Sequence, residues 1–326
     1  MSKINNSFDT NNIERLKMKV MSGETLDIKW RLEQINKINF ILDKYKEEIV
    51  DCLNLDLGKS KIEALAEIIL IKEEIILVKN NLRYWMKPKN IKTPLYLFPS
   101  FSKVIFEPLG CVLILGPYNY PLLYLLKPLI NIFSAGNTAV LKPSEKCPNI
   151  SKLIKELTIK YFDKDILITI EGNYKVAGKL TNLNFDHIFF TGGTKTGKSI
   201  MKSAAKNLIP ITLELSGTNP VIVLKNANIK IAARRIVWGK FFNSGQSCVA
   251  PNHIFVEKII INKFLIELKK SIEDFYGKNP IKSKNISKLE SKQFLKTLEI
   301  LKQLIKNKKV ISGGLFSKKL SKISPT

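Results

Sequence analysis

The chain has 326 residues, 45% of them apolar, so it can bury a sizeable core and is long enough for about two domains. Its formal net charge is +25, but the basic residues are nearly all scattered lysines, whereas nucleic-acid sites use clustered charge and arginine forks, so we expect no nucleic-acid partner. The four cysteines show neither C-x-x-C nor zinc spacing, so we expect no disulfides and no bound metal. The N-terminus is polar, and the apolar stretch at 111–133 is broken by prolines, so we expect no membrane span. Together these features predict a reduced, soluble, cytoplasmic protein.

The first 85 residues have the apolar spacing of helices. Apolar residues recur every three or four positions between Leu26 and Ile41, and again between Ile62 and Ile75. Three prolines then mark an extended connection over residues 86–107, in which residues 104–106 are predicted to form a short strand.

From residue 108 onwards, apolar runs typical of strands alternate with helical patterns. Strands are predicted at 111–115, 138–141, 167–170 and 187–190, and helices at 122–133, 151–161 and 198–206. A continuous apolar run such as residues 111–115 is typical of a strand buried on both faces. This alternation predicts an α/β fold with a Rossmann-like parallel sheet over residues 108–213, to which the helices of residues 1–85 would belong. Ligands of such sheets bind at the carboxyl ends of the strands.

A second α/β region is predicted over residues 214–326. After a strand at 211–215, strands are expected at 221–224 and 253–256, and helices at 229–242, 261–276 and 287–305. The last residues, 323–326, have the pattern that leads into another strand.

The glycine-rich segment Gly192-Gly-Thr-Lys-Thr-Gly-Lys-Ser199 has three interpretations. It matches G-x-x-x-x-G-K-[ST], the phosphate loop of nucleoside triphosphatases, and it lies between a predicted strand and a predicted helix. No later strand ends in an aspartate suited to magnesium, however. The segment could also be a turn without a ligand, or it could hold a nucleotide pyrophosphate at a helix N-terminus.

Three further residues are candidates for chemistry. Cys248 follows a polar glycine turn, Asn243-Ser-Gly-Gln-Ser-Cys248; lone cysteines are usually core residues, but a nucleophile needs the access that such a turn provides. Glu214 lies in an apolar strand, where burial would favour a general base, or where a lysine would pair with it. Asn119, in Gly116-Pro-Tyr-Asn-Tyr-Pro121, is either a turn residue or a donor to an oxyanion.

In their order and amino-acid sequence, these motifs resemble those of the aldehyde dehydrogenase superfamily over nearly the whole chain. The matching segments are Glu107–Gly110, Pro117–Pro121, Ala135–Asn137, Leu141–Glu145, Phe190–Gly192, Leu213–Leu215 and Gly245–Cys248. Within this superfamily, the sequence is most similar to the class 3, fatty-aldehyde branch. The segments that indicate this are Asn-Tyr-Pro at 119–121, Arg234-Arg235 with Trp238-Gly-Lys240, and Phe275-Tyr-Gly277.

This resemblance implies a role for each matching residue. Cys248 would be the nucleophile, Glu214 the general base, and Asn119 with the Cys248 backbone amide the oxyanion hole. NAD or NADP would be the cofactor and a fatty or aromatic aldehyde the substrate. The implied cofactor-binding residues are Lys142 and Glu145 beside the adenine ribose, together with Gly192, Gly193, Thr194, Lys195, Thr196, Gly197 and Leu215.

Three features depart from the family's pattern. Ser216-Gly217 stands where Gly-Gly is usual, and Gly217-Thr-Asn-Pro220 stands where Gly-Lys-Ser-Pro is usual. The family's later Glu-x-Phe-Gly-Pro motif, which grips the nicotinamide ribose, is absent, as are the rest of the catalytic domain and the terminal strands through which the family forms homodimers. The resemblance therefore implies an incomplete catalytic domain over residues 214–326. The alternative functions are an inactive or complementation-dependent fragment and, more distantly, the triphosphatase.

Overall fold

The computed structural model describes residues 10–326, which form two compact units. The first unit consists of the chain up to Ile49 and of Glu67–Glu214, and the second consists of Val50–Ala66 and Leu215–Thr326. Two helices, α3 (Lys46–Leu57) and α4 (Lys61–Trp85), contribute residues to both units. The second unit is therefore built from segments that are far apart in the sequence.

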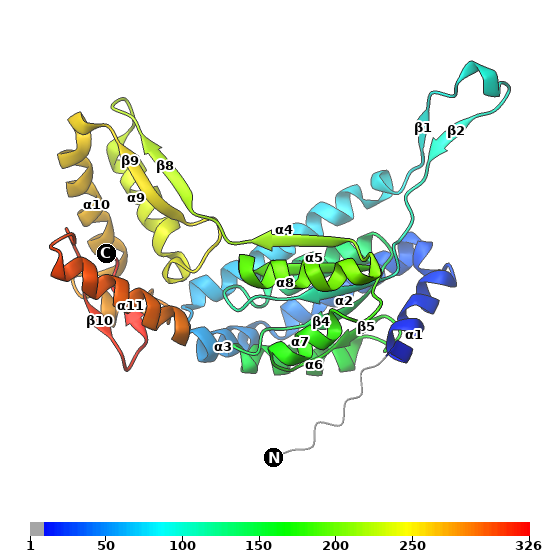
Figure 1. The fold of residues 1–326 in the computed structure, drawn as a ribbon, viewed down its shortest axis with the longest axis horizontal. Coiled ribbons are helices and arrows are strands. Elements are labelled where there is room, and N and C mark those ends of the chain that lie inside the picture. The colour runs from blue at the N-terminus through cyan, green and yellow to red at the C-terminus, as the bar shows by residue number, and fades with distance from the viewer. Residues whose placement is uncertain (1–9) are drawn as a thin grey trace, which may run out of the picture. The chain divides into compact units, whose positions relative to one another are not determined.

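A five-stranded sheet forms the centre of the first unit (Figure 1). Its order is β5 (Leu167–Thr169), β4 (Thr138–Lys142), β3 (Cys111–Leu115), β6 (His187–Gly192) and β7 (Ile211–Leu215). β3 pairs in parallel with β4 and β6, and β4 pairs in parallel with β5. The α/β class and the parallel sheet predicted from the sequence are therefore confirmed.

Helices cover the sheet, which explains why the sequences of its central strands are unbroken apolar runs. All five residues of β3 and all five of β4 are buried. α1 (Thr10–Met21) contacts β3 and β4, α5 (Leu123–Ser134) contacts the same two strands, and α2 (Ile28–Lys44) packs on α5. α6 (Pro148–Tyr161) packs on β5 and α8 (Thr194–Ala204) on β6, and α7 (Tyr174–Leu180) follows β5 in the chain.

The strand order creates a switch point between β3 and β6. From β3 the chain continues through β4 to β5 on one side, and then returns to β6 and β7 on the other. In open α/β sheets, ligands bind in the crevice beyond the carboxyl ends of the two strands at such a point. Asn119 follows β3 and Gly193 follows β6, so the fold directs both segments to this edge.

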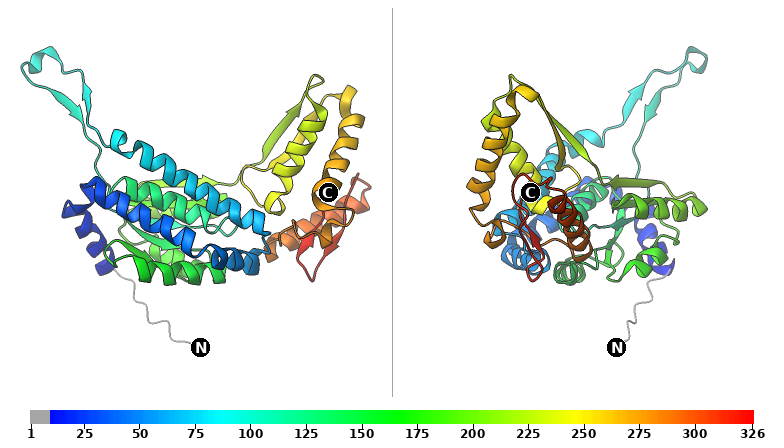
Figure 2. Two further views of the ribbon diagram at one scale, coloured as in Figure 1. Left: turned by 180° about the vertical axis from the view of Figure 1, so that it is seen from behind. Right: turned by 60° about the vertical axis from the view of Figure 1, so that its left-hand side comes forward.

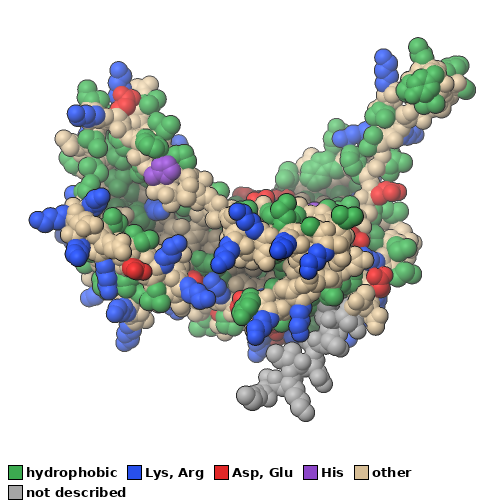
Figure 3. Space-filling model, in the orientation of Figure 1, with side chains coloured by type: hydrophobic (Ala, Val, Ile, Leu, Met, Phe, Trp, Pro, Cys, Tyr) green, Lys and Arg blue, Asp and Glu red, His purple; other side chains and the backbone are tan. Residues whose placement is uncertain are grey.

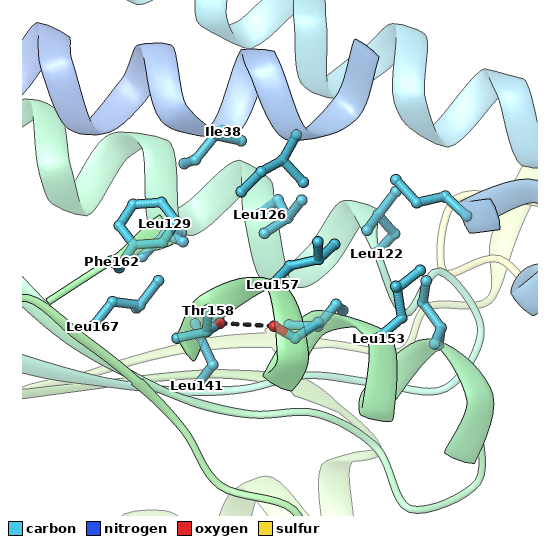
Figure 4. A pocket seen from close by; sticks show the side chains of 14 residues that line it. Ile38, Leu122, Leu126, Leu129, Leu141, Leu153, Leu157, Thr158, Phe162 and Leu167 are labelled. Atoms are coloured by element: carbon cyan, nitrogen blue, oxygen red, sulfur yellow. Dashed lines mark hydrogen bonds between the residues drawn. The ribbon is translucent and has the colours of Figure 1, made fainter. Parts of the chain in front are cut away.

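A small cavity of about 30 Å³ lies in the core of the first unit. Figure 4 shows the 14 side chains that line it, which come from α2, α5, α6 and nearby segments and are apolar except for Thr158. The Thr158 hydroxyl is already hydrogen-bonded to the carbonyl of Ile154 and to Thr169, both at 2.8 Å. A water would need several polar partners, so we interpret the cavity as a dry packing gap.

A hairpin projects from the first unit (Figures 1 and 2). β1 (Lys89–Ile91) pairs antiparallel with β2 (Ser102–Val104). The sequence predicts this strand at 104–106; it lies two residues earlier, because Ser102 pairs with Ile91 and Val104 with Lys89. The connecting residues carry exposed apolar side chains (Figure 3), and Leu95 and Phe101 are each 92% exposed.

The second unit contains a parallel pair of strands, β8 (Asn219–Val223) and β9 (Pro251–Val256), joined through α9 (Ile229–Phe241). Its core includes Val223, Ala233, Ile236, Ile260 and Phe264. The remaining elements are α10 (Ile261–Tyr276), α11 (Ser291–Lys306) and a short ladder of β10 (Phe316–Ser317) with β11 (Lys322–Ile323). Among the helices of residues 10–326, none has the length and apolar character needed to cross a membrane.

Candidate active site

Cys248 follows a tightly constrained turn of the second unit. The turn, η4 (Phe242–Gly245), connects α9 to the segment before β9. Asn243, Ser244 and Gly245 all have positive φ angles, of 53°, 53° and 77°. Glycine adopts this conformation without cost and asparagine tolerates it, whereas serine rarely does. A non-glycine residue held in this way costs about 1–3 kcal/mol, so the turn persists only because its surroundings enforce it.

Four hydrogen bonds from buried or half-buried groups hold the turn. The Asn243 N–H donates to Oε1 of Glu63 at 2.7 Å, and the Ser244 hydroxyl donates to the carbonyl of Ser287 at 2.7 Å. The side chain of Gln246 donates to the Lys288 carbonyl at 3.0 Å and accepts from the Glu290 N–H at 3.1 Å. The turn is therefore fixed to segments far from it in the sequence.

The other side of Cys248 is held by Asn219. The Asn219 side-chain amide donates to the Cys248 carbonyl at 2.7 Å and to the Ala250 carbonyl at 3.1 Å. A side chain at Gly217 would begin only 3.0 Å from the same Cys248 carbonyl. Gly217, which matches the family's pattern, thus leaves little room for a larger residue, and Asn219, which departs from that pattern, reaches the backbone at the cysteine. Cys248 itself is half-buried, so it retains the access that a nucleophile requires.

Asn119 lies in the first unit, in the bend between β3 and α5. α5 has no cap from its own N-terminal residue Leu122; instead, Oε2 of the fully buried Glu67 accepts from the Leu122 and Leu123 N–H groups at 3.2 and 3.0 Å. Glu67 therefore fixes the start of the helix that follows Asn119. Sequence reasoning missed this contact because the two segments are 55 residues apart.

Glu214 corrects one expectation. It lies on β7 as predicted, but its side chain is exposed, so the burial expected for a general base in an apolar strand is wrong for this structure. The alternation of β7 accounts for this, because its neighbours Leu213 and Leu215 point to the other face and are half-buried.

Lys142 and Glu145 lie together at the end of β4. The Lys142 ammonium is buried and contacts the Glu145 carboxylate at 3.0 Å and the Pro143 carbonyl at 2.8 Å. Burial alone would raise the pKa of Glu145, but its own backbone N–H and Lys142 outweigh that effect and hold the pKa below its usual range. A carboxylate is thus kept charged beside the edge where a cofactor is expected.

The glycine-rich segment is mostly helix. The sequence predicts a helix from Lys198, but α8 begins at Thr194 with Gly193 as its N-cap, so only Gly193 lies between it and the end of β6 at Gly192. A phosphate loop needs an extended backbone to wrap a triphosphate, and residues 194–197 are not available for that. Around Gly193 the space is open for a ligand, since an added Cβ would meet no atom within 4 Å.

The structure therefore brings together one group of the predicted site residues. Asn119 follows β3, Lys142 is the last residue of β4, and Gly193 follows β6; these three strands are neighbours in one sheet. Cys248 belongs to the second unit. No cluster of three or more His, Cys, Asp or Glu side chains suited to a metal ion occurs between residues 10 and 326.

Comparison with known proteins identifies the family. The model of the aldehyde dehydrogenase family matches residues 17–325. The chain is 40% identical to the 4,4'-diaponeurosporen-aldehyde dehydrogenase of Staphylococcus aureus, with 93% of this chain and 66% of that protein covered. It is 38% identical to aldehyde dehydrogenase family 3 member H1 of Arabidopsis thaliana, with 97% and 66% covered.

A solved structure extends this similarity to the fold. The substrate-bound state of Staphylococcus aureus AldH superposes with a TM-score of 0.90 at 38% identity, and 97% of this chain and 69% of that chain are covered. The chain thus spans about two thirds of the length of these relatives. By the extent of the family match and by its fold, the chain belongs to the aldehyde dehydrogenase family.

Proposed function

We propose that this chain oxidises an aldehyde to a carboxylic acid with NAD or NADP, and that Cys248 is the nucleophile. The observation that carries the proposal is the strained turn of residues 243–245, which buried partners hold directly before a half-buried cysteine. Strain of this kind is retained where the surrounding structure enforces it, and it clusters at active sites. Family membership supplies the reaction class.

In the first half of the proposed reaction, the Cys248 thiolate forms a C–S bond with the aldehyde carbon, and the carbonyl electron pair moves to oxygen. The Asn119 side-chain amide and the Cys248 backbone N–H are the proposed donors to this oxyanion. When the carbonyl re-forms, the hydrogen on carbon departs as hydride and a thioester remains on Cys248. The cofactor supplies the hydride acceptor when bound.

In the second half, water hydrolyses the thioester. Glu214 is the proposed general base that accepts the proton of the attacking water. The C–S bond then breaks, the carboxylic acid leaves, and the Cys248 thiolate is regenerated. The exposed position of Glu214 gives water direct access to its carboxylate.

The proposed cofactor site lies at the carboxyl edge of the first unit's sheet. Its residues fit a dinucleotide, because the first turn of α8 offers backbone N–H groups to a pyrophosphate and the space at Gly193 is open. Lys142 and Glu145 would lie beside the adenine ribose. The remaining proposed contacts are Gly192, Thr194, Lys195, Thr196, Gly197 and Leu215. For the substrate we propose a fatty or aromatic aldehyde, which the resemblance to the class 3, fatty-aldehyde branch implies.

The deciding experiment compares Cys248→Ala with Cys52→Ala, since Cys52 is the other half-buried cysteine of the second unit. Aldehyde-dependent NAD(P)H formation and ester hydrolysis are measured for the parent chain and both variants, and dinucleotide binding is measured by calorimetry. We expect Cys248→Ala to lose both activities and keep dinucleotide binding, and Cys52→Ala to keep all three. Turnover at the parent rate in Cys248→Ala would end the nucleophile assignment.

A further inference from the structure

Glu63 is a buried glutamate at the third position of α4, 3% exposed, in the second unit. It forms a capping box with Ser60: the Ser60 N–H donates to Glu63 Oε2 at 3.0 Å, and the Glu63 N–H donates to the Ser60 hydroxyl oxygen at 3.3 Å. Such a box ordinarily serves only the start of its own helix. The sequence Ser60-Lys-Ile-Glu63 before an apolar run therefore accounts for a helix start and nothing more.

The carboxylate also accepts hydrogen bonds from two distant segments. The Asn243 N–H donates to Oε1 at 2.7 Å, and the Ser287 hydroxyl donates to Oε2 at 2.7 Å. Together with the N–H and hydroxyl of Ser60, four donors converge on one buried carboxylate. Hydrogen bonds to an ionised acceptor are about twice as strong as neutral ones. Glu63 thus connects the start of α4 to the turn that precedes Cys248.

We propose that Glu63 is a positioning residue for Cys248, an inference that rests on the proposed role of this cysteine as the nucleophile. Asn243 is the first of the three left-handed residues, and its N–H is fixed by Glu63 Oε1. Ser287 donates its hydroxyl to Glu63, and its carbonyl accepts the hydrogen bond from the Ser244 hydroxyl. Glu63 therefore acts on two consecutive residues of the turn, directly and through Ser287, without contacting the substrate.

The geometry predicts that a side chain with two acceptor oxygens is needed at this position. Two backbone N–H groups, those of Ser60 and Asn243, point at different oxygens of Glu63. Glutamine has one acceptor oxygen and one NH₂ group, so in either orientation one backbone N–H faces an NH₂ group. The serine hydroxyls can rotate to accept from the amide, but the backbone groups cannot. Glu63→Gln therefore has to release either the helix cap or the turn.

The test measures acylation of Cys248 by an activated ester, which needs the thiol and the oxyanion hole but no dinucleotide. We expect Glu63→Gln to slow acylation by about 10- to 100-fold, since misplacement by about 1 Å can cost roughly 100-fold in rate. Ser60→Ala removes the hydroxyl of the capping box and keeps the Asn243 bond, so it should stay within about twofold of the parent. Glu74→Gln, a matched change at a buried glutamate further along α4 that pairs with Asn131 and Lys127, should do the same.

Hydrogen exchange of the parent chain supplies a second readout that does not depend on any variant folding. In the parent chain, the Asn243 amide should exchange as slowly as the buried amides of α9. In Glu63→Gln this amide should exchange faster, whereas in Ser60→Ala its exchange rate should stay unchanged. Fast exchange in the parent, or equal loss of acylation in Ser60→Ala and Glu63→Gln, would overturn the positioning role. If Cys248→Ala is acylated as fast as the parent, the proposed nucleophile fails instead, so the two failures are distinguishable.

Discussion

Asn219 offers a quantitative test of how the backbone at Cys248 is held. Its side-chain amide donates two hydrogen bonds, at 2.7 Å to the Cys248 carbonyl and at 3.1 Å to the Ala250 carbonyl. A typical intramolecular hydrogen bond contributes about 0.5–1.5 kcal/mol to stability. Asn219→Ala is therefore expected to lower the free energy of unfolding of the second unit by about 1–3 kcal/mol. With an m-value of about 1–3 kcal/mol/M in urea, the midpoint should fall by roughly 1 M.

Two further substitutions at this position separate donation from packing. Asn219→Asp keeps the size of the side chain but presents an acceptor-only carboxylate to two carbonyl oxygens, so it should destabilise the unit more than alanine does. Asn219→Ser, which restores the residue usual in the family at this position, has one hydroxyl donor and should fall between the parent and alanine. Urea unfolding is followed by the fluorescence of Trp238 in a background with the other two tryptophans, Trp30 and Trp85, replaced by phenylalanine. If Asp is tolerated as well as Ala, Asn219 does not act as the donor and the reasoning is refuted.

The remaining predictions concern the general base, the cofactor and a buried thiol. Glu214→Gln should slow acid release more than hydride transfer, so stopped-flow measurements should show an NADH burst followed by a slow steady state; equal slowing of both phases would contradict its role. Calorimetry should show NAD(P) binding but no magnesium-dependent ATP binding, because α8 begins at Thr194. ATP binding that is lost in Lys198→Ala would contradict this prediction. Burial raises the pKa of the Cys111 thiol from about 9 to about 12, so its contribution to stability is complete below pH 9 and is lost as the pH rises towards 12. The urea midpoint of the first unit should fall over that window, and Cys111→Ala should reduce the fall.

The central sheet was predictable from the sequence because burial on both faces leaves a local signal. β3 and β4 are entirely buried, and their unbroken apolar runs identify both their type and their bounds to within one residue. The start of α8 was not predictable, because a Gly-Gly-Thr segment is compatible both with a loop and with an N-cap followed by a helix. The side chains after Gly193 therefore join a helical first turn four residues earlier than the sequence predicts.

The candidate site was predictable only where a motif is local. The motifs around Cys248, Glu214 and Asn119 could be found because each is a short run of distinctive residues. The partners that hold them leave no such trace: Glu63 lies 180 residues from Asn243, and Asn219 lies 29 residues from Cys248. The exposure of Glu214 was also missed, because an apolar strand indicates burial of only one of its faces unless both are covered.

The discontinuous second unit has a consequence for synthesis of the chain on the ribosome. Its segment of residues 50–66 leaves the ribosome early, but Glu63 finds its partners only 180 and 224 residues later, at Asn243 and Ser287. At about 5–20 residues per second, the first of these delays lasts roughly 10–40 s. During that time Leu53 and Leu57, which are buried in the finished fold, have no partners from residues 215–326, while the strands of the first unit are already being added. The unit that contains Cys248 can thus complete its contacts at Glu63 only after Ser287 has been made, so residues 50–66 wait for their final partners while the first unit is synthesised.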